Sequence, residues 1–583
     1  MRRSFSTLNF ARRVFQLFGF VLLTVVCFAS AAQEQAIYSR KDIFHPVFAA
    51  NGMVATQEER ATRIGVSVLE DGGNAVDAAV AVGFALAVTL PRAGNLGGGG
   101  FMLIHEASSG KTHALDYREM APAASTRNMF LDEKGEVDAG KSRSSRYAAG
   151  VPGTVAGLVL ALERFGTMSL ERVMDPAIRL AEEGFIVSPD LAESLEARKE
   201  RLISNPAAAR IFFHPDGSPY REGDRLVQSD LAWSLKQIAT EGAQAFYQGA
   251  IAKRVVEDMQ TNDGPITAAD LAGYRPVLRA PVTGSYRGYE IRSMPPPSSG
   301  GVHLVQILNI LDGFPIDFLG QNSADTIHVM AEAMKLAYAD RSLHLGDPDF
   351  WKVPVKGLTS KRYADHLRQG IRLDRARPSS TIGPGSPLPY ESDETTHFSV
   401  MDRAGNAVSN TYTINFSYGS GIVAEGTGIL LNNEMDDFSS KPGVPNAYGL
   451  IGGEANAIAP GKRPLSSMTP TIVLKDGRPF LATGSPGGSR IITTTLQIIL
   501  NVIDHDMNIA AATAAPRIHH QWLPDELRVE TGLSVDTLDL LRIRGHEVVE
   551  KNAMGSTQSV MRIDKGFLGA SDPRRPGALT AGQ

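Results

Sequence analysis

Residues 390–400 have the sequence YESDETTHFSV, and the junction of Glu394 and Thr395 inside this run separates two kinds of sequence. Residues 377–389 before it are dense in proline and glycine, which predicts an exposed segment without regular structure. Residues 396–400 and 407–414 after it are rich in valine, threonine and aromatic residues, which predicts two strands joined by a turn. Thr395 therefore stands where a flexible acidic segment meets regular structure, although an ordinary interdomain linker would have the same composition.

Length and composition indicate a globular protein of more than one small structural unit. The chain has 583 residues, of which 43% are hydrophobic and 21% are charged. The net charge of -5 gives no reason to expect nucleic acid as a partner. No HExxH motif or paired CxxC motif occurs, and His519-His520 has no acidic residue at helical spacing. A packed or hydrogen-bonded histidine pair is therefore favoured over a metal site.

The N-terminal residues have the layout of a secretory signal peptide. Arginines at 2, 3, 12 and 13 precede an apolar stretch at 14–28, and small residues follow at 29–32. We expect cleavage near Ala31 or Ala32. A membrane anchor is the alternative, but the apolar stretch is shorter than the roughly 20 residues that a span needs. Cys27, the single cysteine, lies in this segment, so the mature chain would contain no disulfide.

The portion before residue 390 is predicted to mix helices and strands. A helix at 57–69 and a buried helix at 74–86 precede four glycines at 97–100, which indicate close backbone packing because no Lys-Ser/Thr pair of a phosphate loop follows. A strand at 112–117 ends at Arg118-Glu119; taken alone, Arg118 fits a surface charge better than a carboxylate clamp. Strands with turns at Gly284 and Gly288 occupy 279–294. Further helices are predicted at 154–165, 170–183, 190–202, 226–259, 302–311 and 323–345.

The portion after residue 400 carries polar residues in glycine-rich turns. A strand that begins at 429 ends in carboxylates at 434–437, and a loop follows at 442–453. Strands at 471–474 and 480–483 precede the run GSPGGS at 484–489, which opens a helix at 491–503. Adjacent glycine amides at a helix start can hold an anion. Taken alone, the carboxylates fit a solvated turn and the serines fit caps, and the serine spacing does not support a G-x-S-x-G nucleophile elbow.

Together and in this order, these motifs closely resemble the gamma-glutamyltransferase family. The resemblance runs from about Tyr38 to the C-terminus and is densest at 395–400, 431–438, 462–470, 483–492 and 521–526, with further matches at 115–119 and in the PPPSSGG run at 295–301. It implies an α+β N-terminal nucleophile hydrolase fold, in which two stacked sheets lie between helix layers (αββα). It also implies a precursor that cleaves itself between Glu394 and Thr395. The parts would be a signal peptide at 1–32, a large subunit at 33–394 and a small subunit at 395–583.

The resemblance assigns catalytic roles that agree with the chemistry of the residues. Thr395, once N-terminal, would combine a nucleophilic hydroxyl with an α-amine of pKa ~7.7–8.0 as its base. Thr413 matches the position that orients the nucleophile, and Gly487 and Gly488 match the amides of the oxyanion hole. No metal or other cofactor is implied.

The resemblance also assigns a site for the zwitterionic glutamyl head of the substrate, which needs partners of both signs. The residues matching the α-carboxylate site are Arg118, Ser466 and Ser467. Those matching the α-ammonium site are Asn415, Glu434 and Asp437. Tyr448 matches the tip of a lid over the site in many bacterial relatives.

The function implied is transfer of the γ-glutamyl group of glutathione and related compounds, through an acyl-enzyme on Thr395, to water or to amino acids and peptides. Export implies a periplasmic or secreted location, and the partners are the two subunits, γ-glutamyl donors and acceptors. Two alternatives stay open. One is a glutaryl-cephalosporin acylase of the same fold, whose substrate lacks the α-ammonium. The other is an inactive binding protein, against which the intact Thr395, Thr413, Gly487 and Gly488 argue.

Overall fold

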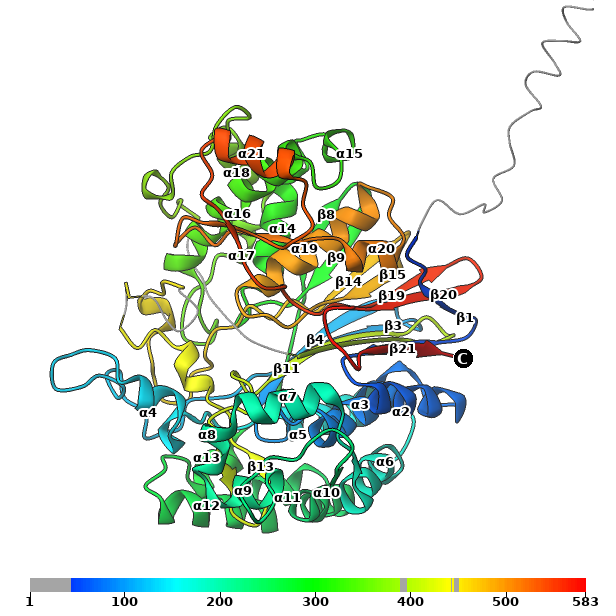
Figure 1. Ribbon diagram of the computed structural model, residues 1–583, viewed down its shortest axis with the longest axis vertical. Coiled ribbons are helices and arrows are strands. Elements are labelled where there is room, and N and C mark those ends of the chain that lie inside the picture. The colour runs from blue at the N-terminus through cyan, green and yellow to red at the C-terminus, as the bar shows by residue number, and fades with distance from the viewer. Residues whose placement is uncertain (1–42, 388–395, 442, 445–449) are drawn as a thin grey trace, which may run out of the picture. The chain divides into compact units, whose positions relative to one another are not determined.

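Two seven-stranded antiparallel sheets organise residues 44–583, which form one unit (Figure 1). The computed structural model describes residues 43–387, 396–441, 443–444 and 450–583. The predicted signal peptide, Glu394, Thr395 and Tyr448 lie outside the described residues.

Each sheet combines strands from before and after the predicted junction at residues 394 and 395. The first sheet has the order β1 (Val47–Ala49), β20 (Gly566–Ser571), β19 (Gln558–Ile563), β15 (Arg478–Thr483), β14 (Thr471–Lys475), β9 (Tyr289–Ser293), β8 (Val282–Tyr286). The second has the order β21 (Leu579–Gly582), β2 (Met53–Thr56), β10 (Thr396–Met401), β11 (Ala407–Thr413), β3 (Gly99–Glu106), β4 (Lys111–Tyr117), β7 (Val277–Arg279). In the first sheet β1 pairs with β20 and β9 pairs with β14. In the second sheet β2 pairs with β10 and β3 pairs with β11, so the two portions share both sheets.

Helices cover the outer face of each sheet (Figure 1). The second sheet carries α2 (Glu59–Glu70), α3 (Ala75–Thr89) and α5 (Thr154–Phe165), with α4 (Ala139–Arg143), α6 (Leu170–Glu183), α7 (Pro189–Ala197), α8 (Lys199–Ile203), α9 (Pro206–Phe212), α10 (Ser229–Glu241), α11 (Ala243–Tyr247), α12 (Ala250–Thr261) and α13 (Ala268–Gly273) on the same side. The first sheet carries α14 (Gly300–Leu311), α19 (Arg490–Ile503) and α20 (Ile509–Ala514), with α15 (Ile316–Leu319), α16 (Ala324–His344), α17 (Val355–Leu358), α18 (Lys361–Arg368) and α21 (Val535–Ile543).

Three small sheets contain the remaining strands of the described residues. They are β5 (Phe185–Ile186) with β6 (Arg225–Leu226), β12 (Val423–Ala424) with β13 (Ile429–Leu430), and β17 (Leu527–Val529) with β16 (Ile518–His519) and β18 (Val548–Glu550). A separate apolar cluster, including Phe101, Met401, Ile472 and Val560, fills the space between the two large sheets. The resulting order of helix, sheet, sheet and helix confirms the predicted αββα architecture.

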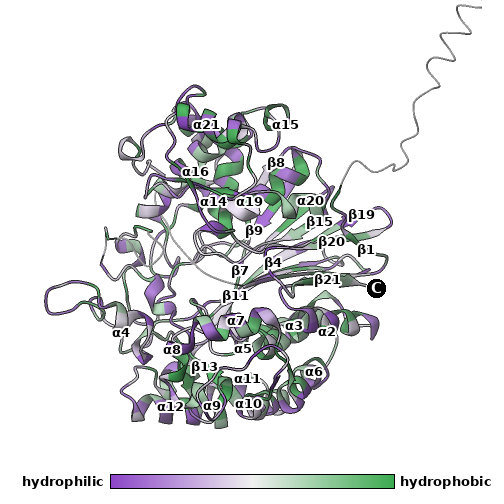
Figure 2. Ribbon diagram, viewed as in Figure 1, coloured by the Kyte–Doolittle hydropathy of each residue, from purple (hydrophilic) through white to green (hydrophobic). Residues whose placement is uncertain are grey.

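The two fully buried helices, α3 and α14, have mainly apolar sequences, although α14 also contains His303, Gln306 and Asn309. Every residue of α3 and of α14 is buried, and both are strongly hydrophobic (Figure 2). Asn74 and Asp77 form a capping box at the start of α3, which satisfies amides that no helical carbonyl can reach.

Several predicted boundaries needed correction. The predicted helix at 226–259 is divided into α10, α11 and α12, with Gly242 at a positive φ of 66° between the first two. The predicted turn at Gly284 is wrong: Gly284 lies inside β8, where a Cβ would approach Val305 to 2.6 Å, so glycine serves close packing there. Gly288, at φ 84°, is the turn between β8 and β9.

The described part of the segment before the junction is exposed at five positions, as predicted, but it is anchored to the rest of the protein at Ser379 and Ile382, which are buried. Ser379 is fully buried, and its amide and hydroxyl both donate to Asp525 at 2.7 Å. The indole of Trp522 donates to the carbonyl of Ile382 at 3.0 Å. The prolines of this segment prevent a regular pattern of backbone hydrogen bonds. Hydrogen bonds to the side chains of Asp525 and Trp522, distant in sequence, hold the segment instead.

The glycine run at 97–100 packs against backbone, as the sequence predicted. A Cβ on Gly97 would lie 2.1 Å from the carbonyl oxygen of Leu430, and one on Gly98 would lie 1.9 Å from that of Thr413. These glycines therefore let β3 and the preceding turn approach the ends of β11 and β13.

Replacing Gly98 with alanine should lower the free energy of unfolding by about 3 kcal/mol, because the methyl group overlaps a backbone carbonyl that cannot rotate away. Gly273 is the matched control, since a Cβ added there would meet no atom within 4 Å. Gly273→Ala should change the free energy by no more than about 0.5 kcal/mol. Urea denaturation of both variants measures the difference, and equal stabilities would contradict the packing argument.

Candidate active site

The described strand β10 begins at Thr396, one residue after the predicted nucleophile. Thr396 pairs with Tyr412, the neighbour of Thr413 at the end of β11. Thr413 is buried, and its hydroxyl accepts a hydrogen bond of 2.8 Å from the amide of Asn415. Asn415 has a positive φ of 68°, which turns the chain sharply after the strand. Glu394 and Thr395 themselves lie outside the described residues.

Thr413, Asn415 and Gly487 line one cleft of about 450 Å³. Gly487 and Gly488 have φ values of 135° and 63°, which residues with side chains rarely adopt. Consecutive amides in such a turn, just before α19, can face a common concavity that suits an anion. The arrangement therefore brings the predicted orienting hydroxyl and a predicted oxyanion residue to the same cavity.

The rest of the cleft wall combines neutral residues with a group of arginines, a feature that the sequence analysis did not predict. Four arginines line it: Arg92, Arg490, Arg574 and Arg575. Two of them have buried or half-buried carboxylate partners, since Arg92 pairs with Asp190 at 2.7 Å and Arg574 pairs with Glu530. The residues lie up to 483 positions apart, so no local pattern indicated that they share a wall.

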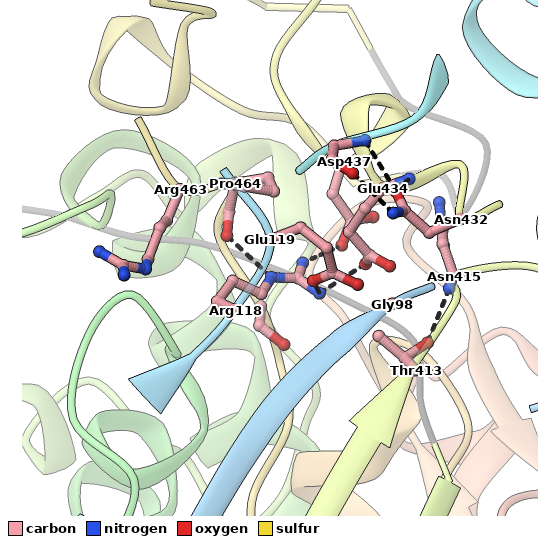
Figure 3. Close-up of polar contacts among 12 residues, drawn as sticks. Gly98, Arg118, Glu119, Thr413, Asn415, Asn432, Glu434, Asp437, Arg463 and Pro464 are labelled. Carbon is pink, nitrogen blue, oxygen red and sulfur yellow. Dashed lines mark hydrogen bonds and ion pairs between the residues drawn. The ribbon is translucent and has the colours of Figure 1, made fainter. Parts of the chain in front are cut away.

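Arg118 forms the centre of a buried ion-pair cluster (Figure 3). Its Nη1 donates to Glu434 Oε1 and its Nη2 donates to Asp437 Oδ2, both at 2.5 Å. Its Nε donates to the carbonyl of Pro464 at 3.0 Å. The side chains of Arg118, Glu434 and Asp437 are 0% exposed, so the surface interpretation of Arg118 and the solvated-turn interpretation of the carboxylates are both wrong.

Burial and charge act in opposite directions within this cluster. Burial disfavours the charged form of Arg118, but the carboxylates of Glu434 and Asp437 outweigh it and raise the pKa of the guanidinium. Burial raises the pKa of Glu434 well above its ordinary value despite the attraction of Arg118. The cluster is therefore held by a permanently charged arginine and by acids whose ionisation is costly.

Ser466 and Ser467 are fully buried, and their hydroxyl oxygens already accept hydrogen bonds. The amide of Met468 donates to Ser466 Oγ at 3.1 Å, and Nη2 of Arg341 donates to Ser467 Oγ at 2.6 Å. Because both oxygens serve as acceptors, both hydroxyl hydrogens can be donated to a ligand. Such a pair of donors suits a carboxylate.

A chain of contacts links the cleft to the ion-pair cluster. The side-chain amide of Asn415 donates to the carbonyl of Asn433 at 2.9 Å, and Asn433 directly precedes Glu434. Asn432 Oδ1 accepts from the amide of Glu434 at 3.0 Å and fixes the turn that carries both acids. Thr413, Asn415, Glu434 and Asp437 thus belong to one continuous region, while Tyr448 lies outside the described residues.

Glu119 and Arg341 are buried residues of this region to which the sequence analysis gave no role. Glu119 stood inside a matching motif, at the end of β4, without a specific signal. Arg341 lies in α16, and its contact with Ser467 spans 126 positions. Only the folded chain brings these side chains to the site.

The described ranges hold neither a candidate metal site nor a candidate membrane span. No group of three histidine, cysteine, aspartate or glutamate side chains in these ranges is placed to hold a metal ion. Nor does any helix of the described residues have the length and apolar character of a membrane span. His519 contacts the hydroxyl of Thr493 at 2.9 Å. His520, whose pKa is lowered by burial, contacts the carboxylate of Asp525 at 3.3 Å, as the interpretation of a packed or hydrogen-bonded pair predicted.

The fold and the site define the class of the protein. Two antiparallel sheets between helix layers, with a strand that starts one residue after a candidate threonine nucleophile, are the architecture of an N-terminal nucleophile hydrolase. Residues 61–582 match the family model of gamma-glutamyltranspeptidase. The chain belongs to the gamma-glutamyltranspeptidase family.

Individual relatives agree with this assignment. The chain is 57% identical to the glutathione hydrolase proenzyme of Escherichia coli (strain K12), over 96% of this chain and 97% of the relative. It is 42% identical to the acylase ACY 1 proenzyme of Pseudomonas sp. (strain SE83), over 92% and 94% of the two chains. The crystal structure of cephalosporin acylase from Bacillus halodurans superposes with a TM-score of 0.83 at 30% identity, covering 95% of this chain and 99% of that one.

Proposed function

We propose that the protein is a γ-glutamyltransferase with glutathione hydrolase activity. The observation that carries the proposal is the pairing of Arg118 with Glu434 and Asp437, two acids against one base in a buried site. A γ-glutamyl head has an α-carboxylate and an α-ammonium on one carbon. Its carboxylate can replace the acids as partner of Arg118, while its ammonium replaces Arg118 as partner of the acids. This exchange leaves no buried charge without an opposite charge.

Catalysis would begin with self-cleavage. The hydroxyl of Thr395 attacks the carbonyl carbon of Glu394, and breakage of the amide C–N bond gives an ester and frees the α-amine of Thr395. Hydrolysis of this ester then frees the hydroxyl and separates the two chains. That amine, with a reference pKa of ~7.7–8.0, then serves as the base for the same hydroxyl. Thr413 would orient the nucleophile, and the amides of Gly487 and Gly488 would stabilise the tetrahedral oxyanion, where the loss of one donor costs ~3–4 kcal/mol.

The turnover would follow from an acyl-enzyme. Attack of Thr395 on the γ-amide releases the amine of the leaving group, and water or an acceptor amine then releases the γ-glutamyl group. Ser466 and Ser467 would donate to the α-carboxylate beside Arg118, and Asn415, Glu434 and Asp437 would bind the α-ammonium. Tyr448 would cover the site as part of a lid.

The acylase function is the second candidate, because relatives of this name share the fold and much of the sequence. A glutaryl group has the carboxylate but not the ammonium. It could occupy Arg118 but would leave Glu434 and Asp437 without a cation. The composition of the cluster therefore favours a γ-glutamyl substrate.

The cellular arrangement is part of the proposal. Residues 1–32 would be removed as a signal peptide on export to the periplasm or outside the cell. Residues 33–394 and 395–583 would then stay together as large and small subunits.

A kinetic assay tests the function. Purified protein should hydrolyse a γ-glutamyl anilide, and a dipeptide acceptor should raise the rate of anilide consumption while a γ-glutamyl dipeptide forms. The glutaryl anilide should react much more slowly with the same preparation. A preference for the glutaryl compound would replace the transferase proposal with the acylase, and inactivity toward both would support the inactive binding protein.

A further inference from the structure

The charged residues that line the candidate active-site cleft are all of one sign. Among the described lining residues, four are arginine and none is aspartate or glutamate. Asp190, which pairs with Arg92 at 2.7 Å, and Glu530, which pairs with Arg574 at 2.5 Å, are not themselves lining residues. The surface that a ligand meets in the cleft is therefore positive. We call its four cations the arginine wall: Arg92, Arg490, Arg574 and Arg575.

Arg490 brings this wall next to the proposed oxyanion position. It is the first residue of α19 and follows directly after the glycine turn. Its amide donates to the carbonyl of Gly487 at 3.2 Å, and a Cβ added to Gly487 would lie 3.8 Å from the Cβ of Arg490. Arg490 is half-buried and Arg575 is exposed, so solvent reaches both side chains. A cation thus stands beside the place proposed for the reacting carbonyl.

The site proposed for the glutamyl head lies outside this cleft. Arg118, Glu434 and Asp437 are not among its lining residues. Asn415 joins the two regions, because it lines the cleft while its side-chain amide donates to the carbonyl of Asn433 at 2.9 Å. The reacting γ-carbonyl carbon carries the glutamyl head on one side and the leaving amine on the other. With the head at the buried cluster, the cleft is the space open to the amine.

We propose that the arginine wall binds the carboxylate of the peptide on the amine side of the reaction, which is the departing dipeptide of glutathione or an acceptor dipeptide. Guanidinium groups bind carboxylates through paired N–H donors. Attack by an acceptor amine on the acyl-enzyme reverses the departure of the leaving amine, so one subsite serves both. This inference rests on the proposed γ-glutamyl function.

The dimensions of the cleft suit such a ligand. An extended dipeptide spans about 7 Å, so its carboxylate would lie that far from the reacting carbonyl. The cleft volume of about 450 Å³ is within the usual range of ligand pockets. The wall would therefore select peptides that end in a free carboxylate over neutral peptides of the same length.

Two members of the wall are suited to mutation. Arg92 and Arg574 also hold Asp190 and Glu530, so their removal would leave a carboxylate without its partner. Arg490→Gln and Arg575→Gln are therefore the variants of choice. Each removes one positive charge and keeps a polar side chain of similar length.

Steady-state kinetics of the mature enzyme test the inference with pairs of compounds that differ in one carboxylate. Glycylglycine and its C-terminal amide are compared as acceptors, and glutathione and its glycine amide are compared as donors. Wild type should prefer the free carboxylate in both pairs, mainly through KM. Each variant should reduce this preference about 3- to 10-fold. Added salt should reduce it in wild type.

The decisive quantity is the change of this preference between wild type and variant. Amidation also alters the intrinsic reactivity of the acceptor amine, but that effect is the same for every form of the enzyme and cancels. Arg403→Gln is the matched control for charge. Arg403 lies in the turn between β10 and β11, at the opposite end of β11 from Thr413. This variant should keep the preference of wild type.

Each outcome bears on the inference. Wild type that uses the acid and the amide of both pairs equally well would overturn it, while leaving the transferase function intact. Variants that lose activity by the same factor on both members of a pair would also overturn it, because arginines that only hold the fold would behave in this way. Wild type inactive toward every γ-glutamyl donor would refute the function and the inference together. If Arg490→Gln does not fold, Arg575→Gln and the wild-type comparison decide the question.

Discussion

Replacing Thr395 with alanine should leave the protein as one uncut chain without hydrolytic activity. The proposed cleavage needs the Thr395 hydroxyl to attack the Glu394 carbonyl carbon, and alanine has no group that can do so. Denaturing gel electrophoresis should show two fragments for wild type and a single chain for Thr395→Ala. N-terminal sequencing of the smaller wild-type fragment should begin at Thr395, and the intact mass of the larger fragment should place its start near Ala32 or Gln33.

Thr396 offers a matched control one position away. Its side chain is fully buried, and its hydroxyl has no hydrogen-bond partner among the described residues. Thr396→Val keeps the shape and removes the hydroxyl, so this variant should still cleave. A Thr395→Ala chain that is cut as in wild type, or a small fragment that starts elsewhere, would refute the assignment of the nucleophile.

Replacing Asp437 with alanine should lower kcat/KM for a γ-glutamyl anilide by about 2–5 kcal/mol in transition-state free energy. Asp437 pairs with Arg118 at 2.5 Å in the free site and would pair with the substrate ammonium in the complex. Its loss removes a buried charge partner from that ammonium. A glutaryl anilide has no ammonium, so its reaction should lose much less. The measurement compares both substrates with wild type and variant.

Asp436 is the natural control for this prediction. It is also buried and adjacent in sequence, but its oxygen accepts from Ser142 at 3.1 Å and pairs with Arg143 at 3.0 Å instead of Arg118. Asp436→Ala should affect the two substrates equally. Equal losses on both substrates for Asp437→Ala would remove the argument for a γ-glutamyl head and favour the acylase.

Local patterns in the sequence were sufficient to predict buried helices and strands, whereas the arrangement of the layers was predicted from the family resemblance. The run at 74–86 is apolar on nearly every side and became the fully buried α3. The runs at 396–400 and 407–414, with threonine, valine and aromatic residues, became the central strands β10 and β11. Helix breaks were harder to predict, because Gly242 interrupts a continuous apolar pattern only through its left-handed backbone.

Site residues that belong to a family motif could be predicted from the sequence. Contacts between segments that are distant in the sequence could not. Arg118 taken alone indicated a surface charge, because its partners lie 316 and 319 positions away. The same reason hid the Arg341 contact with Ser467 and the packing of Ser379 on Asp525. The roles of the predicted residues remain predictions, which the variants above are designed to test.

The alternation of strands within each sheet has a consequence for refolding. β2 lies between β21 and β10, and β1 lies beside β20, so strands on opposite sides of the proposed cut hydrogen-bond directly in both sheets. Before the cut, one chain can form these pairings as a first-order process. After it, two polypeptides must meet first, so recovery from denaturant should become second order and slow on dilution. Before maturation the protein would refold reversibly. After maturation the lifetime of the folded state would depend on its rate of unfolding.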